Sequence, residues 1–493
     1  MRSTLFLLLL LPTFVQAQSF HSQLEFSGFK VHGGSVTKAT DGRYLVGLSV
    51  PCAYTMWAEL DPSGNLIVEH GITSSTVSGQ DVSPEGVLNI FEDQGRITVV
   101  NSGFSSLQNN RWYYNINRYD GAGTIIYSTY YDSEDEWGAN GIKADRDQNK
   151  NIYLAGSGDQ SIQVIKTDSN GIALWENRVY APSQDSLTQG FGMDILPDNQ
   201  GVICVGSTES SIFIAHIGPT GLVNWCKQYN NPNQVNMPHS LRVCDNGDIL
   251  VGGAGFIMRL DSQGNVLTSR FFMLMFTNDI IEYGPNAIYV TAGDVFNSNS
   301  QFIMKLDDSL NPIWFKRIPG GSSFYVWNYL MEKFPDDELV IFGLSSNENY
   351  DFIRIKHEDF SLCTFDSMLP LSHVDMGAFT IDTGIVTSSN LVQLAVSSYD
   401  IQPGLIGHQI CDNAGFDSPI GQPTVLVSPN PASDYLNIDS ETPVDRIHII
   451  DQFGKMVISE SGSIIDVSNL SEGTYLVIIE INGHSLFRPF IKL

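Results

Sequence analysis

The stretch NGIKADRDQNKNIYLAGSGDQSIQVIKTDSNGIALW, residues 140–175, decides the fold of this chain. It holds four short segments rich in β-branched and aromatic residues, separated by turns of Asp, Asn and Gly. Glycine and asparagine tolerate the positive φ angles that tight hairpins require, so this punctuation is typical of consecutive antiparallel strands. The stretch therefore predicts a unit of four strands.

The first turn of this unit recurs eight times, at intervals of 39 to 55 residues, near Gly42, Gly95, Lys150, Gly201, Gly247, Asn286, Asp337 and Asn390. Four strands every 40–50 residues or so is the period of propeller blades, which bury both faces by packing in a ring. We therefore expect an all-β protein with a β-propeller over residues 18–411. A β-solenoid or a tandem of sandwiches is the alternative.

The blade count depends on the last unit, because residues 373–411 supply only three strand-like segments. Residues 23–29 stand alone before the first unit and match the missing fourth segment. We favour eight blades, with residues 22–30 closing the ring, over seven. This arrangement would make Cys363 and Cys411 neighbours, so they are the pair that we expect to form a disulfide. The other cysteines are interpreted as buried free thiols, namely Cys52, Cys204, Cys226 and Cys244.

The N-terminal residues and the overall charge indicate the compartment and the partners of this protein. Residues 1–17 read as a signal peptide: Arg2, an apolar run from Leu5 to Val15, and a small-residue cleavage site ending at Ala17. No later stretch reaches the roughly 18 apolar residues of a membrane helix. The net charge of −28 argues against a nucleic-acid partner, because phosphate binding needs a basic footprint.

A different module follows the repeats. Residues 412–424 contain four Gly and Pro residues and little apolar pattern, which indicates a linker. Residues 425–493 alternate short apolar segments with glycine turns, which predicts a small β-sandwich.

Four pieces of this module occur in a fixed order: Ser-Pro-Asn-Pro at 428–431, Asp-x-x-Gly-Lys at 451–455, Leu-Ser-x-Gly-Thr-Tyr at 470–475, and Lys492 near the end. In the identity, order and spacing of these four pieces, residues 425–493 closely resemble the type A sorting domain of the Bacteroidetes type IX secretion system. A final Leu493 departs from that pattern. The resemblance implies export to the periplasm, then passage across the outer membrane to the surface or medium by the type IX machinery. The residues that carry the motif are Pro429, Asn430, Pro431, Asp451, Gly454, Lys455, Gly473, Tyr475 and Lys492.

The body has a looser resemblance. The spacing of Gly171 to Trp175 and of Gly221 to Trp225 is similar to the tryptophan-docking repeat of quinoprotein propellers. It is also similar to the repeats of secreted Bacteroidetes β-propeller proteins, which is the better match. In both groups the tryptophan packs between blades, so the resemblance implies a structural role.

A search for chemistry finds no zinc-protease, nucleophile-elbow or P-loop motif. We therefore predict no catalytic, cofactor-binding or metal-binding residue, and the sequence indicates no particular cofactor. The segment from Asp145 to Asn151 lacks the Gly and Glu of an EF-hand and fills an ordinary turn position. His216 is interpreted as a packed or surface residue.

One loop is a speculative ligand site because it combines acids with aromatics: Tyr131, Glu134, Asp135, Glu136 and Trp137. The competing interpretation, which we favour, is a solvated loop with its aromatics packed down. Propeller faces gather loops around a central mouth, so a glycan or protein ligand would bind there. We expect a secreted or surface-bound, non-enzymatic binding or adhesion module. The alternative is a propeller enzyme, either a glycan hydrolase or lyase or a quinoprotein-like oxidoreductase.

Overall fold

The computed structural model describes residues 20–492 except for 27–31, 51–53, 74, 78–79, 106–110, 134–139, 159–160, 181–188, 209–210, 231–236, 295–300, 319–328, 336, 345–349, 357–359, 361–365, 369–372, 376–379, 384, 388–390, 396–399, 402–404, 413–424, 429–431, 441–442, 451–455, 472 and 482–483. The signal peptide and the linker after Asp412 fall outside this part, so both stay predictions. The described helical structure is a single 3₁₀ turn, Pro197–Asn199. Among the described residues no helix has the length and apolar character needed to cross a bilayer.

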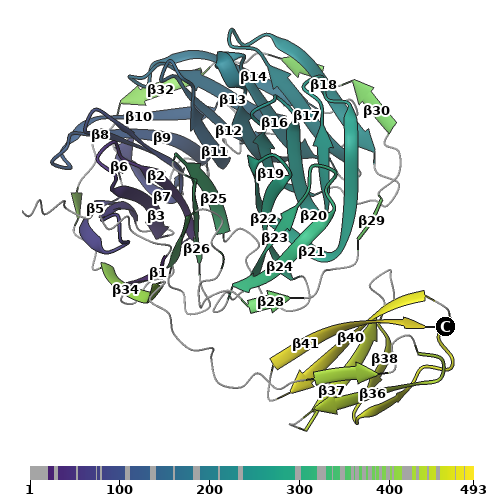
Figure 1. Ribbon diagram of the computed structural model, residues 1–493. Coiled ribbons are helices and arrows are strands. Elements are labelled where there is room, and N and C mark those ends of the chain that lie inside the picture. Colours follow the sequence, from purple (N-terminus) through teal and green to yellow (C-terminus); the bar gives the residue numbers. More distant parts are fainter. Residues whose placement is uncertain are drawn as a thin grey trace, which may run out of the picture.

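Seven antiparallel blades surround a common axis (Figure 1). The first strand of each blade contacts the first strand of the next, so these strands line the axis. Blades 1 and 2 are β2 (His32–Lys38), β3 (Tyr44–Val50), β4 (Tyr54–Leu60), β5 (Leu66–Thr73), then β7 (Gln80–Asp93), β8 (Arg96–Ser105), β9 (Arg111–Tyr119) and β10 (Ile125–Ser133), with β6 (Ser75–Val77) beside β7. Blades 3 and 4 are β11 (Asn140–Arg146), β12 (Ile152–Gly158), β13 (Ser161–Thr167), β14 (Ala173–Tyr180), then β15 (Gln189–Ile195), β16 (Val202–Ser207), β17 (Ser211–Ile217) and β18 (Val223–Asn230).

Blades 5 and 6 share long strands. In blade 5, β19 (Pro238–Val243) pairs with the first half of β20 (Ile249–Leu260), and the second half of β20 pairs with the start of β21 (Val266–Gly284). The chain bends within β20 at Gly255, whose φ of 75° favours glycine. The end of β21 is the first strand of blade 6, which continues with β22 (Ala287–Asp294), β23 (Gln301–Leu306) and β24 (Pro312–Ile318).

Blade 7 takes its fourth strand from the other end of the chain. It consists of β25 (Tyr329–Phe334), β26 (Glu338–Leu344), β27 (Tyr350–Lys356) and β1 (Phe20–Phe26), where β1 pairs antiparallel with β27. The prediction that the N-terminal strand closes the ring is therefore confirmed, but in a seventh blade.

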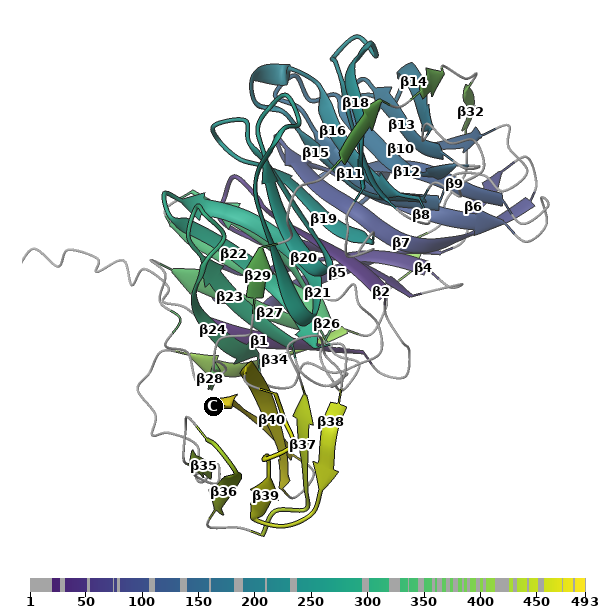
Figure 2. The same ribbon diagram turned by 90° about the vertical axis from the view of Figure 1, so that its right-hand side faces the viewer.

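The eighth blade that we favoured does not form, and the seven-bladed alternative holds. Within their described residues, the segments expected to build it do not pair with one another. Instead each adds a short fifth strand to the outside of a different blade (Figures 1 and 2). We call residues 366–412 the belt, which contains β28 (Asp366–Met368), β29 (His373–Asp375), β30 (Thr380–Thr383), β31 (Ile385–Thr387), β32 (Leu391–Ala395), β33 (Asp400–Ile401) and β34 (Leu405–Asp412).

The belt follows the blades in reverse order. Its strands pair antiparallel with blade 6, then with blades 5, 4, 3, 2 and 1, and finally β34 pairs with β1 in blade 7. An outermost strand otherwise presents unpaired N–H and C=O groups that template association with other chains. The belt covers part of this edge on every blade.

The hydrophobic core is divided among the interfaces between blades. Seven apolar clusters occur in the ring, and each combines residues of two neighbouring blades. The cluster between blades 7 and 1, for example, joins Leu24, Tyr44 and Met56 to Val340 and Phe352. Cys204, Cys226 and Cys244 are buried free thiols, as expected. The side chains of Cys52, Cys363 and Cys411 lie outside the described part, so the proposed disulfide stays a prediction.

In five blades the turn before the fourth strand accepts a hydrogen bond from the preceding blade. Asp261 Oδ1 accepts the N–H groups of Gln263 and Asn265 and so shapes such a turn. Pro219 O, in the same turn of blade 4, accepts from Lys166 Nζ and Trp175 Nε1 of blade 3, both at 3.1 Å. The tryptophan thus packs between blades, as its resemblance implied. Equivalent bonds run from Arg118 to Ser169 O, Trp225 to Ser262 O, Arg259 to Asp308 O and Arg354 to Pro62 O. Lys316 of blade 6 donates to Phe360 O, which follows the third strand of blade 7.

The junction of blades 7 and 1 holds a fully buried carboxylate. Glu338 Oε2 lies 3.0 Å from Lys38 Nζ and 2.8 Å from Arg354 Nη2, and its Oε1 accepts from the Tyr44 hydroxyl. Burial alone would raise the pKa of Glu338. The hydrogen bond from Tyr44 and the charge of Arg354 outweigh that effect, so the pKa lies below its ordinary value.

The C-terminal domain is a sandwich of two antiparallel sheets, as predicted. One contains β35 (Val425–Ser428), β36 (Tyr435–Ser440) and β39 (Ile464–Asp466), and the other β38 (Met456–Glu460), β37 (Arg446–Ile450), β40 (Gly473–Ile481) and β41 (His484–Lys492). Its core, which includes Leu436, Ile449, Ile465 and Val477, is drawn entirely from its own residues. The domain therefore has the internal packing of an independent unit.

We expect Glu338→Gln to lower the free energy of unfolding by about 3 kcal/mol or more, because it leaves the buried charges of Lys38 and Arg354 without their carboxylate. The lowered pKa means that Glu338 stabilises the ring above the ordinary carboxyl pKa, and that this contribution disappears as pH falls through the folded pKa. Urea unfolding of both proteins, from neutral pH to about pH 3, should therefore show a flatter acid limb for the variant. Glu460→Gln, at an exposed position, is the control; equal stability of Glu338→Gln and wild type would contradict the expectation.

A pair of truncations tests the belt. A chain that ends at residue 412 keeps the belt but lacks the C-terminal domain, and we expect it to be monomeric. A chain that ends at residue 365 should self-associate, because the outer strand of every blade loses its pairing partner. Light scattering after size-exclusion chromatography measures the difference. Identical monomers would show that the belt does not protect these edges.

Candidate functional site

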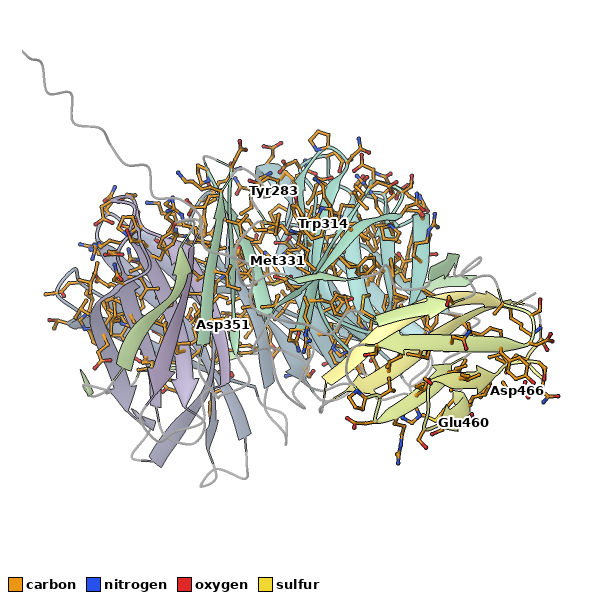
Figure 3. The ribbon with its side chains drawn as sticks, turned by 60° about the horizontal axis from the view of Figure 1, so that its bottom comes forward. Tyr283, Trp314, Met331, Asp351, Glu460 and Asp466 are labelled. Carbon is orange, nitrogen blue, oxygen red and sulfur yellow. The ribbon has the colours of Figure 1, made fainter. Side chains whose placement is uncertain are left out.

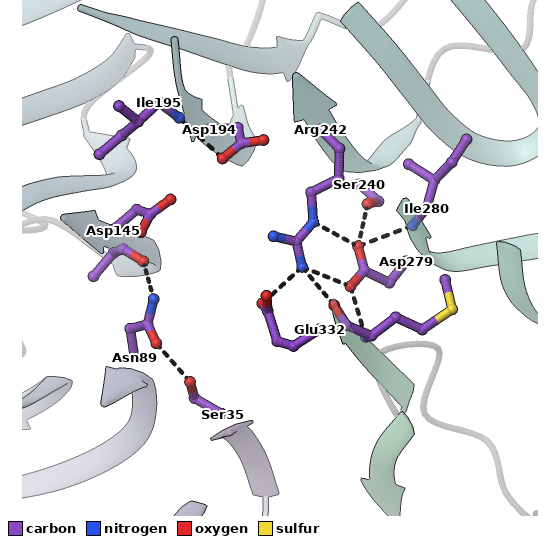
Figure 4. Close-up of polar contacts among 12 residues, drawn as sticks. Ser35, Asn89, Asp145, Asp194, Ile195, Ser240, Arg242, Asp279, Ile280 and Glu332 are labelled. Carbon is purple, nitrogen blue, oxygen red and sulfur yellow. Dashed lines mark hydrogen bonds and ion pairs between the residues drawn. The ribbon is translucent and has the colours of Figure 1, made fainter. Parts of the chain in front are cut away.

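Seven polar side chains, one from the first strand of each blade, surround the axis of the ring (Figure 4). We call them the axial cluster: Ser35, Asn89, Asp145, Asp194, Arg242, Asp279 and Glu332. None of the seven belongs to the apolar clusters between the blades. Ser35 and Asp279 are buried, and the other five are half-buried.

Arg242 connects three blades within this cluster. Its guanidinium contacts both oxygens of Asp279, with Nη2 3.0 Å from Oδ2, and Nη2 also lies 2.9 Å from Glu332 Oε1 and from Met331 O. Ser240 Oγ donates to Asp279 Oδ1 at 2.8 Å. The charge of Arg242 outweighs burial and holds the pKa of Asp279 below its ordinary value.

Neutral hydrogen bonds make the corresponding connection on the opposite side. Ser35 Oγ donates to Asn89 Oδ1 at 2.7 Å, and Asn89 Nδ2 donates to Ala144 O at 2.8 Å. Blades 1, 2 and 3 are therefore linked in series at the axis. These bonds fix side chains in place, which is the arrangement expected of a structural network.

Blades 3 and 4 meet differently, because each contributes a carboxylate. Asp194 Oδ2 accepts the N–H of Val243 at 2.7 Å, whereas the described contacts of Asp145 are limited to a bond from the N–H of Arg146. Burial and the neighbouring charge of Asp194 raise the pKa of Asp145 to about 7. Burial also raises the pKa of Asp194, against the charge of Arg242. One carboxyl of this pair thus titrates near neutral pH, which is the property of a general acid or base.

A second group on the axis-lining strands is His239 of β19. Its imidazole is buried between the rings of Phe191 and Phe276, at centroid distances of 5.9 and 5.5 Å. Burial lowers the pKa of His239 to about 4, so the ring is neutral at physiological pH. Within the described residues, no three His, Cys, Asp or Glu side chains are grouped as a metal site.

The residues singled out from sequence are dispersed. Tyr131 belongs to β10, is fully buried and donates its hydroxyl hydrogen to Gly171 O, so it packs blade 2 against blade 3. The other members of the speculative loop lie outside the described part, namely Glu134, Asp135, Glu136 and Trp137. In the segment from Asp145 to Asn151, the two acids diverge: Asp145 reaches the axis, and Asp147 accepts from the N–H and Nδ2 of Asn151 and caps the turn. His216 is half-buried beside Trp225 and Gln200 O.

The rest of the axial cluster was missed by sequence reasoning. The signal that would have found it is a charged residue between apolar ones in the first strand of successive units, as at Asp194 and Arg242. Asp279 and Glu332 occupy similar strands. The contacts themselves join residues 37 to 90 positions apart, so no local pattern reveals them.

Three of the predicted sorting-motif residues are described. Gly473 begins β40 and pairs with Lys492 at the end of β41, which closes the four-stranded sheet. Tyr475 is buried and donates to Ser471 O at 2.9 Å, so it braces the preceding turn. The remaining motif residues lie outside the described part: Pro429, Asn430, Pro431, Asp451, Gly454 and Lys455.

Residues 426–492 match the family of secretion system C-terminal sorting domains. The C-terminal sandwich is a type IX sorting domain. This sorting domain indicates export of the chain, and its bounds agree with the span of strands β35 to β41. A comparison with curated proteins finds no match.

Solved structures similar to this chain include a Dos1 propeller, YCF48 bound to a D1 peptide, and the Pan2 WD40 domain of Neurospora crassa. Their sequence identities are 9%, 12% and 11%, and their TM-scores are 0.40, 0.43 and 0.42. They cover 69%, 68% and 67% of this chain, and 95%, 97% and 95% of their own chains. The propeller assignment for this chain rests on its own strand pairing.

We expect Asp145→Asn to stabilise the ring at pH 8 but hardly at pH 4 or so. A raised carboxyl pKa means that the folded state binds a proton more tightly than the unfolded state, so wild-type stability falls as pH rises from about 4 to 7. The charged groups near Asp145 are Asp194, Lys143, Arg146 and Glu332. Urea unfolding at several pH values measures the effect.

The exposed Asp245→Asn is the matched control, since its side chain is 95% exposed. Parallel pH profiles for wild type and Asp145→Asn would show that Asp145 is ionised throughout this range.

Proposed function

We propose that this chain is an exported binding module: its sorting domain delivers a rigid seven-bladed ring to the cell surface or medium, where the ring binds a glycan or a protein at one of its faces. The observation that carries the proposal is a sorting domain with its own core, joined to a ring whose axial polar groups are mostly engaged between blades. Asp279, Arg242 and Asn89 are all held in that way. Such groups hold the ring rigid, and a rigid scaffold presents its loops for recognition.

Export proceeds, in this proposal, from the signal peptide at residues 1–17 to the periplasm, and then across the outer membrane by the type IX machinery. The acidic chain, with its net charge of −28, stays soluble and avoids anionic surfaces in transit. Nucleic acid is not a proposed partner.

An enzyme is the second candidate, because one observation favours it. The pKa of Asp145 is raised to about 7 beside a second carboxylate, Asp194, at the axis. Glycan hydrolysis uses two carboxyl groups whose pKa values are pushed apart in this way. The axial pair would then supply the acid and the base.

A glycan array combined with an activity screen separates the two candidates. Binding without turnover, unchanged by Asp145→Asn, is expected for the binding module. Turnover of any glycan that Asp145→Asn and Asp194→Asn abolish would establish the enzyme instead.

The export step has its own test. Removing residues 425–493 should leave a folded ring in the periplasm, and fusing them behind a signal peptide should carry a neutral reporter to the surface of a type IX-competent host. Thermal unfolding of the truncated ring should match the ring transition of the full chain, because the sorting domain has its own core. If the truncated chain reaches the surface, or the reporter stays in the periplasm, this route is wrong.

A further inference from the structure

The outer face of the three-stranded sheet in the sorting domain exposes two large apolar side chains. Tyr435 of β36 is 55% exposed and Ile464 of β39 is 63% exposed, in the full chain. The register pairs Tyr435 with Asp466 and Asn437 with Ile464, so Tyr435 and Ile464 are diagonal neighbours on one face. Such neighbours lie roughly 7–8 Å apart, within reach of a tyrosine side chain.

Strand pairing places two polar residues in the same face. Ser428 pairs with Asn437, which in turn pairs with Ile464, so these three residues form one exposed row across the sheet. We call the surface of Ser428, Tyr435, Asn437, Ile464 and Asp466 the Tyr435–Ile464 face. The neighbouring residues Leu436 and Ile465 point the other way, into the core.

Other large apolar side chains are exposed on the described surface of the ring. They are spread over six blades, mostly at the start of outermost strands: Ile67, Ile126, Ile172, Leu174, Leu222, Met237, Leu267 and Ile313. Ile172 and Leu174 lie two residues apart at the start of one strand. Single exposed aliphatic residues of that kind are normal on a protein surface. Tyr435 and Ile464 differ from these aliphatic residues, because they place an aromatic ring beside an aliphatic side chain across two paired strands of the sorting domain. Contiguous exposed apolar surface of this kind marks an interaction site.

Acidic residues border this face. Asp434 precedes Tyr435 and is exposed, and the register places Asp466 directly across from Tyr435. Figure 3 shows Asp466 in the sorting domain. Hydrogen bonds from Ser468 hold the pKa of Asp466 below its usual range, so its negative charge persists. Residues 425–493 contain nine acidic and four basic residues, so the domain as a whole is acidic.

We propose that the Tyr435–Ile464 face is the surface by which the secretion machinery recognises the sorting domain, and that the receptor presents an apolar groove with a basic rim. A sorting domain must be bound by a receptor, and this face combines exposed apolar anchors with an acidic rim. A basic rim on the receptor would be complementary to it. Apolar anchors surrounded by polar residues are the usual arrangement of binding hot spots. The inference rests on the proposed export function and names the surface that carries it out.

The test uses the full chain in a type IX-competent host, with the surface and medium fraction measured against the periplasmic fraction. Tyr435→Thr combined with Ile464→Thr removes both anchors but keeps residues that favour strands. We expect the exported fraction to fall about ten-fold or more, because anchors of this kind dominate binding. Thermal unfolding of the purified chain should stay unchanged, since exposed substitutions have little effect on stability.

Met456→Thr is the matched control, because Met456 is 53% exposed in the same domain but lies on the other sheet. It should be exported like wild type, and so should Tyr435→Phe, which keeps the aromatic ring. Asp434→Lys tests the basic rim without touching the apolar anchors, and it should also reduce export.

The outcomes separate this inference from the function on which it depends. If wild type is not exported, the export function itself fails. If wild type and the double threonine variant are exported equally, the face is not the recognition surface. If the double variant unfolds, Asp434→Lys and Tyr435→Phe decide: normal export of Asp434→Lys, or loss of export with Tyr435→Phe, overturns the proposal.

Discussion

Ring closure is the constraint on which this structure depends. Every blade has two apolar faces, and seven separate clusters cover them only if the last blade also packs against the first. Two separate interactions hold blade 7 against blade 1 and so close the ring. The N-terminal strand β1 completes blade 7, and the buried carboxylate of Glu338 draws Lys38 of blade 1 towards Arg354 of blade 7. Residues about 300 positions apart are thereby held together.

The interfaces of the ring are not equivalent. At the junction of blades 7 and 1, opposite charges surround Glu338, and ionisation favours the folded state. At the axis between blades 3 and 4, Asp145 faces Asp194, and ionisation opposes the folded state. Among the polar contacts of the axial cluster, the interface between blades 3 and 4 therefore contains a like-charge pair. We expect local opening to cost less free energy at this interface than at the junction of blades 7 and 1.

Much of the fold could be predicted from sequence because blade units are local. The alternation of strands and Asp-Gly turns in residues 140–175 identifies four strands without any knowledge of the ring. For residues 373–411 the same reasoning gave a wrong prediction, since short apolar segments look alike whether they pair with one another or with six different blades. Pairing at that range depends on the closed ring and leaves no periodic trace in the sequence.

The candidate site was harder to predict for a related reason. The sequence pattern places Asp145 beside a turn, but the carboxylate that raises its pKa, Asp194, comes from the next blade. Arg242 and Asp279 look like isolated charges in two strands, and only the ring brings them to one axis. The sorting domain was predictable because its motif is contiguous, whereas its exposed face depends on the register between β36 and β39.

The belt also determines how the molecule carries mechanical load. Its strands attach to the blades one after another, and its last strand, β34, lies against β1 just before the sorting domain begins. Tension applied through the C-terminal end therefore reaches β34 first, and then β33, β32 and the others in turn. The belt strands are two to eight residues long, and each can separate from its blade while the four inner strands of that blade stay paired. Seven belt strands, paired with the blades one after another, must therefore separate before such a force acts on the four inner strands of a blade.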